Sequence, residues 1–401
     1  MDLTSRSKIP ERTDPDPPDQ LVGARLQKQP QKILVRGVNW LGDAVMTTPA
    51  LQRLREAHPG ASITMLTPAK LNALWSNHPD VDDVIAIEPG EGLLSVARRI
   101  RKRRFTLGVI FPNSPRSALE LWLGGVHRRV GYAWPWRNWC LTDAIPPDPA
   151  KTQMRKRSVQ EIQTLIAEPT LPGGRGFGSE GHHIFHYLRI VEAVGGQSTP
   201  VSPRIMIAES EVKALRQKWS VYFSKENVTW FGLNPGAEYG PAKRWPAEYY
   251  IEAALDLSKR IGCHWMVFGG KGDIALCSKI TQGIQEGLES VNKVSEVHDF
   301  SGQTTLRELC VLLRMCSMVL TNDSGPMHLA AAIGVPVVVP FGSTSPELTG
   351  PGLPGSAGHV VLKSTAPCAP CFLRECPIDF RCMREHTVEK LVRAVLDLLK
   401  R

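Results

Sequence analysis

The sequence has no uninterrupted apolar run of the roughly 18–20 residues that a membrane-spanning helix needs. Its opening stretch, MDLTSRSKIPERTDPDPPDQ, also lacks the apolar segment of a secretory signal. This stretch is instead rich in Pro, Asp and Arg, a composition typical of disordered segments. We therefore expect residues 1–30 to form a disordered tail and the protein to be cytoplasmic.

Several common binding signatures are missing as well. No Walker sequence and no G-x-G-x-x-G turn follows a suitable strand, which argues against an ordinary ATPase or dehydrogenase pocket. Neither zinc-finger spacing nor an RNA-binding signature accompanies the net charge of +9, so we expect no nucleic-acid partner. No residue pattern demands a cofactor or a catalytic metal, and we expect neither.

The nine cysteines are scattered except for four near the C-terminus. The first two of these four have the C-x2-C spacing of half a zinc site, but the later gaps do not repeat the pair. Buried structural thiols are therefore the favoured interpretation, and a metal or cluster site is the alternative. The four residues are Cys368, Cys371, Cys376 and Cys382.

The positive charge is partly concentrated in the stretch RRIRKRRF, which begins at Arg98. One interpretation is a solvated helix face that precedes a strand. The other is a contact with anionic lipid or a phosphorylated glycolipid. The cluster consists of Arg98, Arg99, Arg101, Lys102, Arg103 and Arg104.

The length of 401 residues exceeds what one ordinary core supports, so we expect two domains. Strand-like runs such as KILVRG, SITMLT and FTLGVIFP alternate with amphipathic stretches from Lys32 onward. The same alternation returns at Thr229 with TWFGLNPG, HWMVFGG, SMVLTND and VPVVVPFG. This pattern predicts an α/β protein with two doubly wound, Rossmann-like domains that face a cleft, where ligands bind at the carboxyl ends of the strands.

The domain boundaries follow from a change in composition. Residues 146–203 are rich in Pro and Gly and contain one helical stretch near residues 184–194, which indicates loops and a connection. We therefore predict an N-terminal domain with its connector at 31–203. A C-terminal domain at 204–384 and a C-terminal helix within 385–401 complete the chain.

Asp43 follows a glycine just after the first strand-like run, among apolar neighbours, in NWLGDAVMTTPAL. It lies either in the first turn of a helix or in a loop before a helix that Thr48 caps and Pro49 begins. Both placements leave the carboxylate at the end of the strand and facing the predicted cleft. The residue is therefore either a helix cap or a general base.

The C-terminal half contains two stretches suited to a diphosphate. The loop LNPGAEYGPAKRWP carries Gly236 and places Lys243 and Arg244 directly before a helix. In TNDSGPMHLAAA, a strand ends and a helix begins, with Pro suited to its first turn. Free N–H groups and the helix dipole there favour a phosphate, although Asp323 or Ser324 could merely cap the helix.

Five stretches together resemble the ADP-heptose:lipopolysaccharide heptosyltransferases, an inverting glycosyltransferase family, and within them the heptosyltransferase II type. The stretches are GDAVMTTPALQRLR, PGAEYGPAKRWP, TNDSGPMHLAAA, FGSTSPELT and CAPCFLRECP, which occur in the family's order. The resemblance covers the chain from about Lys32 to its end. It leaves out the N-terminal tail, and the stretch 171–183 is interpreted as an insertion.

The resemblance implies a glycosyltransferase B-type fold and the transfer of L-glycero-D-manno-heptose from ADP-heptose to the lipopolysaccharide inner core. It implies that Asp43 is the base and that Lys243 contacts the donor phosphates. It also implies that Asp323 faces the heptose, that Ser324 and Gly325 face the phosphates, and that His328 lies nearby. Because such an acceptor is an anionic glycolipid, we also expect peripheral contact with the inner face of the inner membrane. Related enzymes with another nucleotide-sugar or core position, and a non-catalytic nucleotide-sugar binder, are the alternatives.

Overall fold

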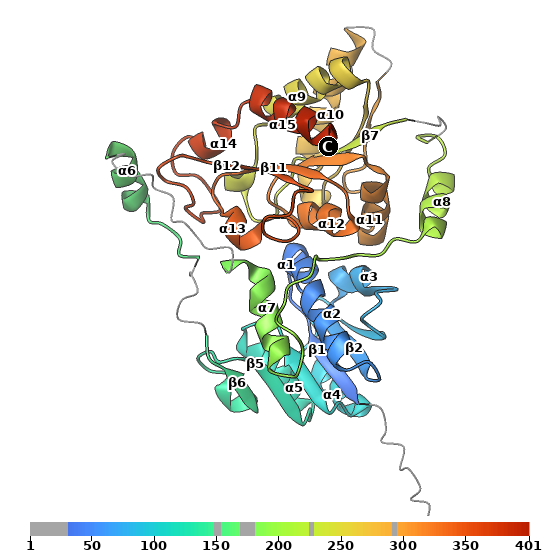
Figure 1. Cartoon of the computed structure of the whole chain (residues 1–401), viewed down its shortest axis with the longest axis vertical. Coiled ribbons are helices and arrows are strands. Elements are labelled where there is room, and N and C mark those ends of the chain that lie inside the picture. Colours follow the sequence, from blue (N-terminus) through green and yellow to red (C-terminus); the bar gives the residue numbers. More distant parts are fainter. Residues whose placement is uncertain (1–30, 148–153, 169–180, 224–227, 291–294, 401) are drawn as a thin grey trace, which may run out of the picture. The chain divides into compact units, whose positions relative to one another are not determined.

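The first half of the chain folds around a parallel sheet. The computed structural model describes residues 31–147, 154–168, 181–223, 228–290 and 295–400, so the predicted tail and most of the stretch 171–183 lie outside the described residues. The sheet has the strand order β3-β2-β1-β4-β5-β6 (Figure 1). Its strands are β1 (Lys32–Arg36), β2 (Ser62–Pro68), β3 (Asp83–Ile87), β4 (Leu107–Ile110), β5 (Arg128–Tyr132) and β6 (Asp143–Ile145).

The central strands of this sheet are apolar because helices cover both faces. Ile33, Leu34 and Val35 of β1 are completely buried, and they belong to two different hydrophobic clusters on opposite faces of the sheet. The covering helices are α1 (Leu41–Met46), α2 (Thr48–Ala57), α3 (Asn72–Trp75), α4 (Leu93–Arg103), α5 (Pro115–Leu123) and α7 (His183–Glu192).

Helix α7 comes from the stretch predicted as a connector, yet it is part of this core. It packs against α1 and α2 and also contacts β4 and β5. Ile184, Leu188 and Val191 of α7 are buried in the same cluster as the core side chains of β1. The helical stretch near residues 184–194 was therefore predicted correctly. Its contribution to the N-terminal core was not.

The second half repeats the same topology. Its sheet has the order β12-β11-β10-β7-β8-β9, which is again the 3-2-1-4-5-6 order when counted from β7. The strands are β7 (Trp230–Asn234), β8 (His264–Val267), β9 (Val297–Asp299), β10 (Met318–Thr321), β11 (Val337–Phe341) and β12 (Val360–Lys363). The helices of this half are α8 (Glu209–Lys218), α9 (Ala247–Ile261), α10 (Ile274–Glu289), α11 (Leu306–Met315), α12 (Gly325–Ile333), α13 (Pro346–Thr349), α14 (Arg381–Arg384) and α15 (Val388–Leu399); α6 (Val159–Ala167) precedes them in the chain.

The predicted α/β class and the parallel sheets are confirmed. Three strands went unpredicted, namely β5, β6 and β9. Strand β5, RRVGY, begins with two charged residues and ends in a glycine and a tyrosine, so it has no apolar run. Strands β6 and β9 each have only three residues and lie at sheet edges. Among the described residues, no helix is long and apolar enough to cross a membrane.

Candidate active site

Asp43 lies in the first turn of α1, a six-residue helix that begins at Leu41, shortly after β1 ends. A separate helix, α2, follows with Thr47 as its N-cap and a proline in its first turn. The structure therefore decides between the two predicted placements in favour of the helical one. The Asp43 side chain keeps 29% of its surface exposed, so it remains accessible to an acceptor hydroxyl.

The glycine before Asp43 is explained by a close contact with α12. A Cβ built at Gly42 would lie only 2.7 Å from Cδ2 of His328. Conversely, a Cβ at Gly325, the first residue of α12, would lie 2.9 Å from the Leu41 side chain. The two glycines thus let the starts of α1 and α12 meet, which brings a residue of each half of the chain to one site.

His328 is buried within this contact and carries no charge at neutral pH. Burial lowers its pKa to about 4, although the nearby carboxylates of Asp323 and Asp43 act in the opposite direction. The prediction that His328 lies near the anion site stays a prediction. Its imidazole can serve there as a neutral hydrogen-bonding group, not as a cation.

Two further residues, which were not predicted from the sequence, lie beside Asp43. Nδ1 of His183 lies 3.5 Å from Oδ1 of Asp43. The Asp43 carboxylate also acts on the hydroxyl of Tyr187, since burial first and then the Asp43 charge raise the pKa of Tyr187 well above its usual value. Both residues come from α7 and stand four positions apart, the spacing that places side chains on one helix face. That spacing was the only available sequence signal.

The first turn of α12 remains open to a ligand. Ser324 is the N-cap residue, but its side chain makes no capping hydrogen bond. Its hydroxyl instead accepts a hydrogen bond of 3.1 Å from Nδ2 of Asn234, at the end of β7. The simple capping interpretation is therefore wrong for Ser324. The first N–H groups of this nine-residue helix are left for another acceptor.

Asp323 is tied to Lys243 across the ends of two neighbouring strands. Nζ of Lys243 donates to Oδ2 of Asp323 at 2.6 Å, and the Thr344 hydroxyl donates to the same oxygen at 2.6 Å. The Asp323 side chain is only 4% exposed and that of Lys243 is 13% exposed. Lys243 also lies 4.9 Å from the centre of the Tyr239 ring. The ion pair with Lys243 and the bond from Thr344 together explain how a carboxylate can be buried there.

Arg244 and Gly236 meet at Asp273. The Arg244 guanidinium donates to Oδ1 of Asp273 at 3.1 Å. A Cβ at Gly236 would lie 2.4 Å from Oδ2 of the same carboxylate, so only glycine lets the loop after β7 pass this close. Asn322 holds that loop from β10, since its side chain donates to Pro235 and accepts from the backbone of Trp245. The sequence analysis did not identify Asp273 or Asn322.

All the predicted site residues therefore follow the carboxyl ends of β1, β7 or β10. In each sheet the strand order reverses direction between its two central strands, β1 and β4 or β7 and β10, which is where ligands bind in doubly wound folds. Burial dominates the pKa of His328, but Asp43 from the first half and Asp323 and Lys243 from the second half all lie close enough to influence it, the carboxylates upward and the lysine downward. The structure thus joins the predicted base to the predicted phosphate site through one histidine.

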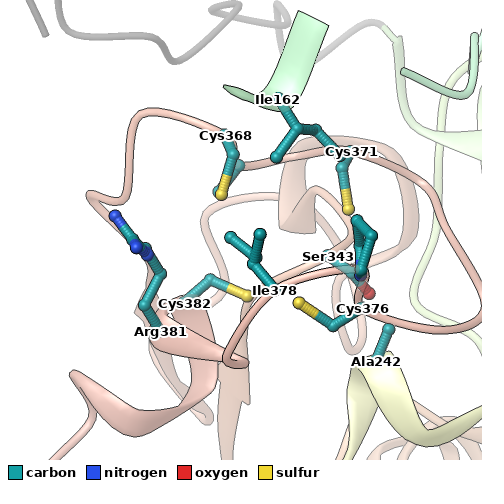
Figure 2. Close-up of a pocket in the computed structure, with 11 residues that line it drawn as sticks. Ile162, Ala242, Ser343, Cys368, Cys371, Cys376, Ile378, Arg381 and Cys382 are labelled. Carbon is teal, nitrogen blue, oxygen red and sulfur yellow. The ribbon is translucent and has the colours of Figure 1, made fainter. Parts of the chain in front are cut away.

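The cysteine cluster forms a separate pocket. Cys368, Cys371, Cys376 and Cys382 all line it, and Figure 2 shows the side chain of Ile378 among their sulfur atoms. All four are free cysteines, and three of them are buried. Burial is the main cause that raises the pKa of Cys368, Cys371 and Cys382, which favours protonated thiols. Within the described ranges, no three His, Cys, Asp or Glu residues are arranged to hold a metal ion.

Two doubly wound sheets with candidate residues at their carboxyl ends have the architecture of the glycosyltransferase B-type fold. The known structure of E. coli ADP-heptose LPS heptosyltransferase II matches with a TM-score of 0.70 and 25% identity, over 92% of this chain and 99% of that one. A family 9 glycosyltransferase from Veillonella parvula matches the fold with a TM-score of 0.72 and 22% identity, over 92% of this chain and 97% of that one.

The chain belongs to glycosyltransferase family 9, the heptosyltransferase family, whose model matches residues 93–380. It is also similar to lipopolysaccharide heptosyltransferase 2 of E. coli strain K12. The identity is 28% over 327 residues, which make up 80% of this chain and 85% of that relative. The prediction of a glycosyltransferase is thereby confirmed.

Proposed function

We propose that this glycosyltransferase moves L-glycero-D-manno-heptose from ADP-heptose to the inner core of lipopolysaccharide, with inversion at the anomeric carbon. The observation that carries the proposal is the contact between α1 and α12 at Gly42 and His328, which sets Asp43 beside the open first turn of α12. The names of the E. coli relatives support the donor and the acceptor.

Asp43 acts as the base in this proposal. Inverting transfer needs one carboxylate to take the proton of the acceptor hydroxyl while its oxygen attacks the anomeric carbon from the opposite face. Asp43 is suited to this because it is partly exposed and lies next to the second half of the chain without being part of it. The acceptor then occupies the side of the first sheet, and the donor the side of the second.

The donor diphosphate binds at the carboxyl ends of β7 and β10. The N–H groups of Gly325 and its neighbours at the start of α12, with the helix dipole, stabilise the charge that develops on departing ADP. Lys243 adds a positive charge near the diphosphate. It also forms an ion pair with Asp323, which faces the heptose. Arg244 and Gly236 form the adjacent wall of the phosphate site.

The exposed cations near α4 attach the enzyme to an anionic membrane surface. Arg99 and Arg103 form ion pairs with Glu91 and Asp83. Arg103 is nevertheless exposed, as are Arg98, Arg101, Lys102 and Arg104. The end of α4 lies near the start of β1, since Nζ of Lys32 donates to the Arg103 carbonyl at 3.5 Å. That edge is opposite to Asp43, so the cluster serves attachment and does not line the acceptor site.

A transfer assay tests the proposed function. Purified protein is incubated with ADP-heptose and an inner-core acceptor, and ADP release and the modified glycolipid are both measured. We expect both products in equal amounts and neither without the acceptor. Binding of ADP-heptose without any transfer would indicate a nucleotide-sugar binder. Transfer from another nucleotide-sugar, with no reaction of ADP-heptose, would overturn the donor assignment.

A further inference from the structure

Helix α7 contributes two side chains to Asp43 that the proposed reaction does not yet use. We propose that Tyr187 orients the Asp43 carboxylate and that His183 passes the proton of Asp43 to solvent after each transfer. The inference deepens the proposed function and rests on Asp43 as the base. Both α7 residues act through Asp43 and are therefore positioning residues.

The two side chains differ in exposure, and this difference assigns their roles. Tyr187 is 5% exposed and lies edge-on against Phe111, with ring centroids 5.4 Å apart. Burial first and then the Asp43 charge raise the pKa of Tyr187 well above its usual value, so its hydroxyl stays protonated and can donate to Asp43 without carrying the proton away. The His183 side chain is 20% exposed, so its ring keeps a path to water when a bound acceptor covers Asp43, whose own side chain is 29% exposed without substrate.

The reaction itself creates the need for a proton exit. Transfer breaks the O–H bond of the acceptor and leaves its proton on Asp43, which cannot act as a base again until that proton departs. Asp43 gives the proton to Nδ1 of His183, the resulting imidazolium loses its Nε2 proton to water, and tautomer exchange through water frees Nδ1 again. No electrons change hands, and both residues return to their starting forms. The 3.5 Å separation of Oδ1 and Nδ1 is long for a hydrogen bond and must shorten when substrate binds.

The other groups around Asp43 do not offer this path. His328 of α12 is buried and uncharged, and behind it lie Asp323 and Lys243, which are paired with each other. Just before α7, its N-cap residue His182 is 1% exposed and is held by structural hydrogen bonds. Its Nδ1 accepts from the backbone of Ile184, and its Nε2 bonds to the Gly350 carbonyl at 3.1 Å.

Substituting His183 is therefore a clean test of proton transfer, because α7 is anchored by other residues. In His183→Ala we expect kcat to fall by at least about tenfold. The loss should be smaller than the 10²–10⁴ that general-base catalysis typically contributes. We expect the KM for ADP-heptose to stay unchanged and added imidazole to restore much of the rate. In Tyr187→Phe we expect kcat to fall about ten- to a hundredfold, as for one lost hydrogen bond to a charged group, without imidazole rescue.

His127→Ala is the matched control, since His127 is an exposed histidine of the same half of the chain, between α5 and β5. It should keep wild-type kcat and ignore imidazole. Two outcomes would overturn the proton relay through His183. One is wild-type kcat in folded His183→Ala, and the other is a loss of kcat that added imidazole does not restore. If the alanine variant does not fold, His183→Gln replaces it, and wild-type kcat there has the same meaning.

Asp43→Asn separates this inference from the proposed function. An active asparagine variant removes the base assignment and the relay together. An inactive Asp43→Asn beside a fully active His183→Ala overturns only the relay, because Asp43 then exchanges its proton directly with water.

Discussion

The imidazole ring of His328 lies against the backbone of Gly42, so close that a methyl group at position 42 would come within 2.7 Å of Cδ2. This contact connects the start of α1 with the first turn of α12 and therefore the two halves of the chain. It also gives the glycine before Asp43 a physical reason. The distance between the base and the phosphate site depends on it.

Gly42→Ala should destabilise the protein by about 1–3 kcal/mol, the range typical of overpacking a well-packed site. His328 cannot move easily because it is buried. Denaturant unfolding measures the change. Gly60→Ala is the control, since a Cβ at Gly60 meets nothing within 4 Å. Equal stability of the two variants would show that the contact at Gly42 yields without cost.

Asp43→Asn should lower kcat by about two to four orders of magnitude, because the amide is nearly isosteric with the carboxylate but cannot accept a proton. ADP affinity should hardly change, since the donor residues follow β7 and β10 and not β1. Steady-state kinetics and calorimetry measure the two quantities. Undiminished turnover in the folded variant would remove Asp43 from the mechanism.

Lys243→Ala should weaken ADP binding by about 1.5–3 kcal/mol, the range for hydrogen bonds to charged groups. It should also lower stability, because among the described residues Asp323 would then keep only Thr344 as a side-chain partner in a buried position. Lys243→Arg should recover part of both losses, since the two cations differ in shape.

Calorimetry with ADP and denaturant unfolding separate the two effects of Lys243→Ala. Lys279→Ala is the control, because Lys279 is exposed on α10 in the same half of the chain. Lys243 is a purely structural partner of Asp323 if the alanine variant loses stability while its ADP affinity equals that of the control.

The arginines near α4 should produce salt-sensitive binding to anionic vesicles. Each basic side chain near an anionic surface contributes about 1 kcal/mol, and salt screens the attraction within roughly 10 Å at 0.1 M. Replacing the exposed Arg98, Arg101 and Arg104 by glutamine should weaken vesicle sedimentation at low salt.

A matched triple variant controls for net charge in that experiment. Glutamine at Arg216, Arg384 and Arg393 removes the same charge from exposed positions outside the cluster. If both triple variants bind equally, or if binding ignores salt, the cluster is not the contact. No vesicle binding at low salt would favour a solvated helix face.

Buried histidines should make the protein less stable in mild acid. Burial lowers the pKa of His78, His182 and His328 to about 4, below the usual value of about 6.5 in an unfolded chain. The unfolded state therefore binds more protons between these pH values, so this stability is present above about 6.5 and is lost as pH falls toward 4. Each histidine contributes at most roughly 3 kcal/mol.

Unfolding free energies measured from pH 7 to pH 4 test this dependence. His182→Gln should reduce the slope, because glutamine can still bond to Gly350 but does not titrate in this range. An unchanged slope in this variant would mean that His182 becomes protonated without cost in the folded state.

The candidate site was predictable where it depends on the ends of central strands. The cores of β1, β7 and β10 are short apolar runs, and the predicted Asp43, Gly236 and Asp323 follow their ends. Strand β5 was missed because its sequence, RRVGY, mixes charge with apolar residues, and only its neighbours β4 and β6 make it a strand. Local sequence cannot reveal such pairing.

The sequence by itself determined the chemical groups and the strand ends that carry them, since apolar periodicity and turn residues act over a few neighbours. The tertiary structure alone decided which groups meet. It brought His183 and Tyr187 to Asp43, buried the Lys243–Asp323 pair, and made His328 neutral. These properties depend on distance and on exclusion of water, and residues far apart in the chain create both.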